Sequence, residues 1–164
     1  METMDPLDRQ IAAARKLARE RKLDEAFVKA DRIIEQFPSA LEALRLRAFV
    51  CELRNEWELA EADTSRAIHL QPDEIVLYFN RARFLFAQGM YRPALEDINT
   101  AFEISVAENE SYYVTALYGW RAEILLKLGR RAEAREDIEK LDDDYRNWTD
   151  QLRTKQDLLR DAGS

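Results

Sequence analysis

A chain of 164 residues suits one domain with a sizeable core. Its formal charge of −7, from 32 acidic and 25 basic residues, argues against a general nucleic-acid or anionic-membrane surface, while leaving room for local basic patches. Four glycines and four prolines leave little material for sheets or barrels and favour an all-helical fold.

The compartment is predicted from what the sequence lacks. Cys51 is the only cysteine, so no internal disulfide can form. No apolar run approaches the length of a membrane span, and the acidic first residues lack the apolar region of a secretory signal. These features predict a cytoplasmic protein.

The first predicted helix starts at Asp5 and Pro6. Proline suits the first helical position because it has no amide hydrogen to leave unpaired, and aspartate is a good cap before it. This helix is expected to run to about residue 20, and a partner helix is expected over residues 24–37.

Two pairs of residues further along have the spacing of a capping box. Ser39 precedes Glu42 by three residues, and Asn55 precedes Glu58 by three. In a capping box each side chain accepts a hydrogen bond from the other residue's backbone amide. We therefore expect the next two helices to begin at these places.

A fixed spacing of 34 residues relates successive segments of the chain. Small and bulky apolar residues keep their places from one segment to the next. They are Ala14, Leu23, Ala26 and Ile33 in the first segment, Ala48, Trp57, Ala60 and Ala67 in the second, and Ala82, Tyr91, Ala94 and Ala101 in the third. Such a period predicts stacked helical hairpins rather than a single globular core.

At these positions the chain resembles the tetratricopeptide repeat (TPR) family, whose 34-residue units carry a proline near the end. Three units cover residues 7–40, 41–74 and 75–108. The first two units close with Pro38 and Pro72, while Val106 takes that place in the third. Gly129 follows Gly89 by 40 residues instead of 34, so a fourth unit over 115–148 requires an insertion.

The resemblance implies an all-α fold: a right-handed α-α superhelix of about four TPR hairpins in a single domain over residues 1–164. A terminal helix over residues 149–161 is expected to cap the array, because the last repeat would otherwise leave its apolar face in water.

The insertion over residues 107–114 has two interpretations. The first helix of the fourth unit can begin early, near Asn109 or Ser111, or the connection can be a longer loop. We favour the helix, because Tyr113, Leu117, Trp120 and Ile124 follow helical spacing.

Residues suited to catalysis are sparse. His69 is the only histidine, which excludes a metal site with two histidine ligands. Cys51 lies in an apolar helical stretch and is interpreted as a packed thiol. No glycine-rich phosphate-binding motif is present. We therefore expect a protein that is not an enzyme and uses neither a cofactor nor a metal.

The resemblance also implies which residues bind a partner, because the first helix of each TPR hairpin lines a concave surface. The positions carried over from the family are Arg15, Arg45, Phe49, Phe79, Arg83, Phe86, Glu123 and Lys127. Arginines interleaved with phenylalanines suit a peptide that carries acidic and apolar side chains. For Phe49 and Phe86 the alternative is that they only seal the packing between repeats.

Two functions from different classes follow. Small acidic proteins made of such repeats resemble bacterial secretion chaperones and immunity proteins, which implies an adaptor or chaperone-like protein that binds one segment of a partner protein. The alternative is a structural subunit that forms a homodimer or docks in a larger complex through its convex or terminal surfaces. Neither function requires nucleic acid or a membrane as partner.

Overall fold

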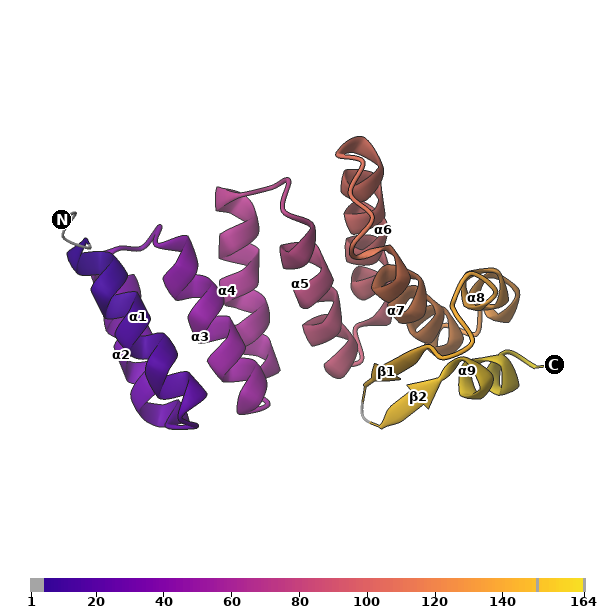
Figure 1. The fold of residues 1–164 in the computed structure, drawn as a ribbon, viewed down its shortest axis with the longest axis horizontal. Helices are drawn as coiled ribbons and strands as arrows, with labels where there is room; N and C mark the ends of the chain where they lie inside the picture. Colours follow the sequence, from indigo (N-terminus) through magenta and orange to yellow (C-terminus); the bar gives the residue numbers. More distant parts are fainter. Residues whose placement is uncertain (1–4, 150, 164) are drawn as a thin grey trace. The chain divides into compact units, whose positions relative to one another are not determined.

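The computed structural model describes residues 5–149 and 151–163, which are almost entirely helical (Figure 1). The helices are α1 Pro6–Arg19, α2 Leu23–Gln36, α3 Leu41–Leu53, α4 Trp57–Leu70, α5 Ile75–Ala87, α6 Tyr91–Ala107, α7 Val114–Lys127, α8 Arg131–Ile138 and α9 Lys155–Ala162. Two short strands, β1 Arg146–Trp148 and β2 Leu152–Thr154, precede α9. The expected all-α helical repeat is confirmed. Its right-handed superhelical arrangement stays a prediction.

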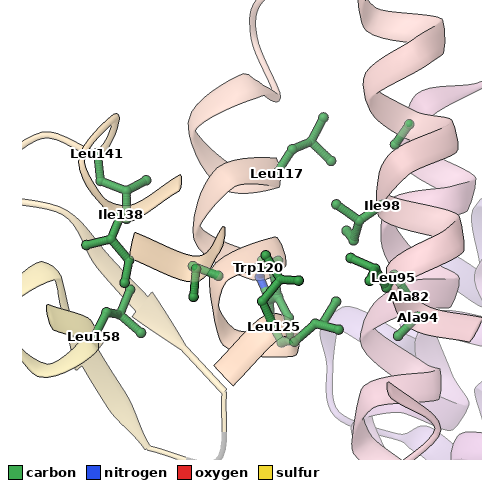
Figure 2. Close-up of a cluster of buried hydrophobic side chains, with 14 of the residues drawn as sticks. Ala82, Ala94, Leu95, Ile98, Leu117, Trp120, Leu125, Ile138, Leu141 and Leu158 are labelled. Atoms are coloured by element: carbon green, nitrogen blue, oxygen red, sulfur yellow. The ribbon is translucent and has the colours of Figure 1, made fainter. Parts of the chain in front are cut away.

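Consecutive helices pack as hairpins: α1 with α2, α3 with α4, α5 with α6, and α7 with α8. The residue contacts divide the chain into two compact units, Met1–Asp73 and Glu74–Ser164, where the sequence predicts a single domain. Each unit has its own apolar cluster, the first around Ala14 and Leu44 and the second around Ile98 and Leu117. Figure 2 shows part of the second cluster, with Leu95 and Ile98 of α6 on one side of α7 and Ile138, Leu141 and Leu158 on the other.

Asp5 caps α1 as predicted, since its carboxylate accepts a hydrogen bond from the amide of Leu7 at 2.7 Å and Pro6 begins the helix. The two predicted capping boxes are absent. Helices α3 and α4 begin after Ala40 and Glu56, and neither cap residue accepts a hydrogen bond through its side chain. Asn55 instead has a positive φ of 59°, which belongs to the turn that ends α3.

That turn recurs in every hairpin. The second residue beyond the first helix has a positive φ in all four, namely Arg21, Asn55, Gly89 and Gly129. The amide of the next residue then bonds back across the turn, for example from Met90 to the carbonyl of Leu85 at 2.9 Å. This is the Schellman pattern, in which the last unpaired carbonyls of a helix accept hydrogen bonds from amides beyond its end. It fixes the tight reversal between the two helices of each hairpin.

Gly89→Ala is expected to lower the free energy of unfolding by about 1–2 kcal/mol, because a Cβ disfavours the left-handed conformation. The φ of Gly89 is 75°, and no atom lies within 4 Å of an added Cβ, so the cost comes from the backbone alone. Urea unfolding measures it. Asn55→Gly at the equivalent turn is the control and should cause no comparable loss. An unchanged stability for Gly89→Ala would contradict this account of the turn.

The end of the second helix depends on proline. Helices α2 and α4 have 14 residues each and end two residues before Pro38 and Pro72. Proline favours an extended conformation in the residue before it and so stops a helix. Where Val106 replaces proline, α6 continues to Ala107 and has 17 residues.

The favoured interpretation of the insertion is therefore wrong. Helix α7 begins at Val114 rather than near Asn109 or Ser111, so residues 108–113 form a loop. The inserted residues lengthen the end of α6 and this loop. Asn109, with a φ of 53°, lies at the turn that ends α6, where Glu110 donates to the carbonyl of Ser105 at 2.9 Å.

The C-terminal segment also differs from the prediction of a helix over 149–161. Strands β1 and β2 form an antiparallel hairpin, and α9 begins only at Lys155. Thr154 and Asp157 form a capping box that fixes this start, since each side chain accepts from the other residue's backbone amide. Leu158 of α9 is fully buried and lies with Ile138 and Leu141 in Figure 2, so α9 covers the end of α8.

Candidate functional site

A repeated ion pair holds the two helices of three hairpins together. In each pair the Nε and Nη2 atoms of an arginine on the first helix donate to both carboxylate oxygens of an aspartate on the second, at 2.6–2.7 Å. The pairs are Arg47–Asp63, Arg81–Asp97 and Arg121–Asp137. All three aspartates are buried. Because these arginines pair with buried aspartates and hold the two helices of a hairpin together, they are not candidates for ligand binding.

The predicted site residues of unit Met1–Asp73 lie together on α1 and α3. Arg15 and Arg45 both bind the carboxylate of Glu42, the second with Nη1 at 3.5 Å from Oε1. Phe49 follows Arg45 by one helical turn on the same face. Its side chain is 47% exposed. We call Arg15, Glu42, Arg45 and Phe49 the α1–α3 site.

The predicted residues of α5 have a different environment. The ring of Phe86 meets the rings of Trp120 and Tyr91 edge to face, with centroids 5.4 and 5.3 Å apart. Phe79 packs against Trp120 at 6.4 Å. The guanidinium of Arg83 lies over the rings of Phe79 and Trp120 at 5.9 and 5.8 Å. The contacts with Trp120 join α5 to α7, and the contact with Tyr91 joins α5 to α6, so Phe86 packs between these helices.

Glu123 on α7 is 4% exposed and is held by the chain's own C-terminal segment. Arg153 of β2 donates its Nε to Glu123 at 3.0 Å and also binds Asp161 of α9. Tyr145, which follows α8 in the chain, packs against Gly119 of α7. The C-terminal hairpin therefore covers part of α7, and the ion pair between Glu123 and Arg153 holds it against this helix.

Lys127 is exposed at the end of α7 and borders an open cavity of about 510 Å³. We call this cavity the C-terminal cleft. Its described residues come from the ends of α5 and α7, the start of α8, the β1–β2 hairpin and α9. Its lining residues are Phe86, Glu123, Leu126, Lys127, Arg131, Thr149, Gln151, Arg153, Arg160 and Asp161.

Glu123 gives a prediction for the pH dependence of stability. Burial raises the pKa of Glu123 above its usual 4.5, and Arg153 opposes the rise only in part. The folded chain then binds this proton more tightly than the unfolded chain, so the contribution of Glu123 to stability falls as the pH rises through its raised pKa. The wild type should lose stability relative to Glu123→Gln over that range in urea unfolding. A difference that stays constant or grows with pH would contradict this assignment.

The described residues offer little for catalysis. They contain no group of three His, Cys, Asp or Glu side chains able to hold a metal ion. Burial raises the pKa of Cys51 to about 12, so its thiol stays protonated and unreactive at neutral pH. The Nδ1 atom of His69 lies 2.7 Å from the carbonyl oxygen of Ser65 within its own helix. Among the described helices, none has the length and apolar character to cross a membrane.

No protein-family model and no curated protein matches the chain. Solved structures do share its fold. PilF of Pseudomonas aeruginosa is 20% identical with a TM-score of 0.67, over 82% of this chain and 59% of its own. YrrB, described as a TPR protein with an unusual peptide-binding site, is 20% identical with a TM-score of 0.67, over 79% of this chain and 64% of its own.

The type III secretion chaperone SycD of Yersinia enterocolitica, solved with a peptide of the translocator YopD, is 16% identical. Its TM-score is 0.70, over 77% of this chain and 97% of its own. This chain spans less than two thirds of the PilF and YrrB chains. At such identities the likeness concerns the fold alone, and it agrees with the helical hairpins described above. The chain has the helical-repeat fold of tetratricopeptide repeat proteins.

Proposed function

We propose that this chain is a non-enzymatic protein-interaction module that binds a peptide segment or helix of a partner protein, as an adaptor or chaperone-like factor in the cytoplasm. The observation that carries the proposal is the α1–α3 site. It presents an exposed aromatic ring beside two guanidinium groups that share one carboxylate.

The chemistry of this site suits a ligand with acidic and apolar side chains. Arg15 and Arg45 carry two positive charges against the single negative charge of Glu42. A guanidinium has five N–H donors, so donors are left for a carboxylate of the ligand. Phe49 adds an apolar surface, and an aromatic ring next to arginine is a common centre of binding energy in protein interfaces.

The neighbours support a polypeptide ligand. YrrB is described as having a peptide-binding site, and SycD was solved with a bound peptide. Their fold is shared here, and a secretion-chaperone or immunity role for this chain is part of the proposal. Arg15, Arg45 and Phe49 form its contact set, while Phe79, Arg83, Phe86 and Glu123 hold α5, α7 and the C-terminal hairpin in place.

The test uses a displayed library of random peptides. Peptides selected by the wild type should combine Asp or Glu with aromatic or aliphatic residues. In fluorescence anisotropy, Phe49→Ala and Arg45→Glu should each weaken binding of a selected peptide by about tenfold or more. Phe37→Ala is the matched control, because Phe37 is 42% exposed against 47% for Phe49 and lies outside the site.

Equal binding by the wild type and Phe49→Ala would contradict a role for the α1–α3 site. An equal loss of binding for Phe49→Ala and Phe37→Ala would also contradict it, since that result would indicate nonspecific binding by exposed aromatic rings.

A second candidate function is that of a structural subunit that self-associates. The end of α6 and the loop that follows it favour this function, because Val106 on the last turn of α6 and Tyr112 in the loop are 81% and 82% exposed. Large exposed apolar groups mark association surfaces. If this candidate holds, Val106→Ser with Tyr112→Ser should convert a dimer to a monomer in light scattering. A wild type that is already monomeric would exclude it.

A further inference from the structure

We propose that the C-terminal cleft is a second binding site, which takes an acidic segment of a partner polypeptide. The inference rests on the proposed function for the kind of partner, but it concerns other residues. The cleft depends on the β1–β2 hairpin and α9, which lie outside the repeated hairpins.

The wall of the cleft is held rigid by ion pairs within the chain. Arg153 lies between Glu123 and Asp161 and binds both carboxylates. Its side chain is only 13% exposed. Arg153 offsets one of the two negative charges of the carboxylates that line the cleft, so the remaining one faces three other described cations, Lys127, Arg131 and Arg160.

Those other cations leave the cleft positive. Arg160 pairs with Asp157 at 3.1 Å. Within the described parts of the chain, neither Lys127 nor Arg131 has a carboxylate partner within 4 Å. Among the lining residues that the structure describes, four are cationic and two are anionic, in a protein whose formal charge is −7. A positively charged cleft on a negatively charged protein is complementary to an acidic partner and suppresses the binding of basic partners.

The remaining walls point to a polypeptide rather than a small anion. Phe86 and Leu126 give one side an apolar surface, which a phosphate ion would not use. The volume of about 510 Å³ lies in the range of pockets that enclose several chemical groups at once. A segment with carboxylates near Lys127 and Arg131 and an apolar side chain between them would satisfy both surfaces.

The test uses three labelled peptides of about eight residues that alternate leucine with glutamate, glutamine or lysine. Fluorescence anisotropy with the full chain should show binding of the glutamate peptide only. This binding should weaken between about 50 mM and about 500 mM NaCl, because exposed charge pairs are screened. Failure to bind the glutamate peptide, or equal binding of all three, would overturn the proposal.

Charge-reversal variants then locate the site. Lys127→Glu with Arg131→Glu should weaken binding by about tenfold or more. Lys127→Gln with Arg131→Gln should also weaken it and disturbs the fold less. Arg92→Glu makes the same kind of change on α6 of the same unit, outside the cleft, and should bind like the wild type. Circular dichroism checks that each variant is folded.

The outcomes separate this site from the α1–α3 site. If Phe49→Ala abolishes binding of the glutamate peptide and the Lys127 and Arg131 variants do not, the cleft proposal fails and the proposed function stands. If the Lys127 and Arg131 variants lose binding and Phe49→Ala keeps it, the cleft proposal is supported on its own. Full competition by inorganic phosphate at low concentration would mean that the cleft is an anion site, which would also overturn the proposal.

Discussion

Asp63→Ala is expected to lower the free energy of unfolding by about 3–5 kcal/mol, one of the two largest effects we predict for this chain. Asp63 is 1% exposed, and both of its carboxylate oxygens accept from Arg47, at 2.6 and 2.7 Å. Removing the carboxylate leaves the buried guanidinium of Arg47 without its main partner, because Asp31, its other partner, is 40% exposed. Urea unfolding followed by circular dichroism measures the loss.

Two variants separate this explanation from a general loss of packing. Asp31→Ala removes the more exposed partner of Arg47 and should cost much less than Asp63→Ala. Arg47→Met combined with Asp63→Leu removes both charges and fills similar space. The double variant should recover most of the stability, because a buried ion pair is often no better than an apolar pair. A double variant as unstable as Asp63→Ala would contradict the explanation.

Gly119→Ala is the second large effect, with an expected loss of about 1–3 kcal/mol. An added Cβ on Gly119 would lie 1.7 Å from the hydroxyl oxygen of Tyr145 and 2.3 Å from the adjacent ring carbon. No side chain fits between α7 and Tyr145 unless the segment after α8 moves. Thermal or urea unfolding measures the effect.

The sign of this effect should reverse when Tyr145 is absent. The three atoms nearest to the added Cβ all belong to Tyr145. In a Tyr145→Ala background, Gly119→Ala should therefore stabilise by about 0.5–1 kcal/mol, the normal advantage of alanine over glycine within a helix. The same sign in both backgrounds would show that something other than Tyr145 restricts Gly119.

The sequence predicts most of the helices because equivalent residues of a repeat recur at a fixed spacing along the chain. Ala48, Ala82 and their partners occupy equivalent places, and the starts of α3 at Leu41 and α5 at Ile75 fall one period apart. The buried ion pairs recur in the sequence as well. Arg47 and Arg81 are 34 residues apart, as are Asp63 and Asp97. The pairing itself was missed because exposed and buried charges look alike in a sequence.

Sequence patterns that do not repeat along the chain were less informative about the structure. Ser39–Glu42 and Asn55–Glu58 have capping-box spacing, but Asn55 lies in a left-handed turn because the Schellman pattern needs such a residue there. The β1–β2 hairpin has strands of three residues, too short for an alternating pattern to show. The C-terminal cleft depends on that hairpin and could not be predicted.

The same limit applies to the site residues. Phe49 and Phe86 are both phenylalanines on the first helix of a hairpin, so their residue type does not separate them. Phe86 meets Trp120 and Tyr91, whereas Phe49 is 47% exposed. Which phenylalanine faces solvent depends on aromatic neighbours such as Trp120, which lies far along the chain from Phe86, and the structure is needed to show that contact.

The central claim, that the α1–α3 site contacts a partner polypeptide, is tested most directly by photo-crosslinking. A benzoyl-phenylalanine replaces Phe49 in one sample and Phe37 in another, two positions of similar exposure. With a peptide selected by the wild type, irradiation should give a crosslinked product at position 49 and little or none at position 37. Equal crosslinking at both positions, or a product at position 37 alone, would contradict the claim.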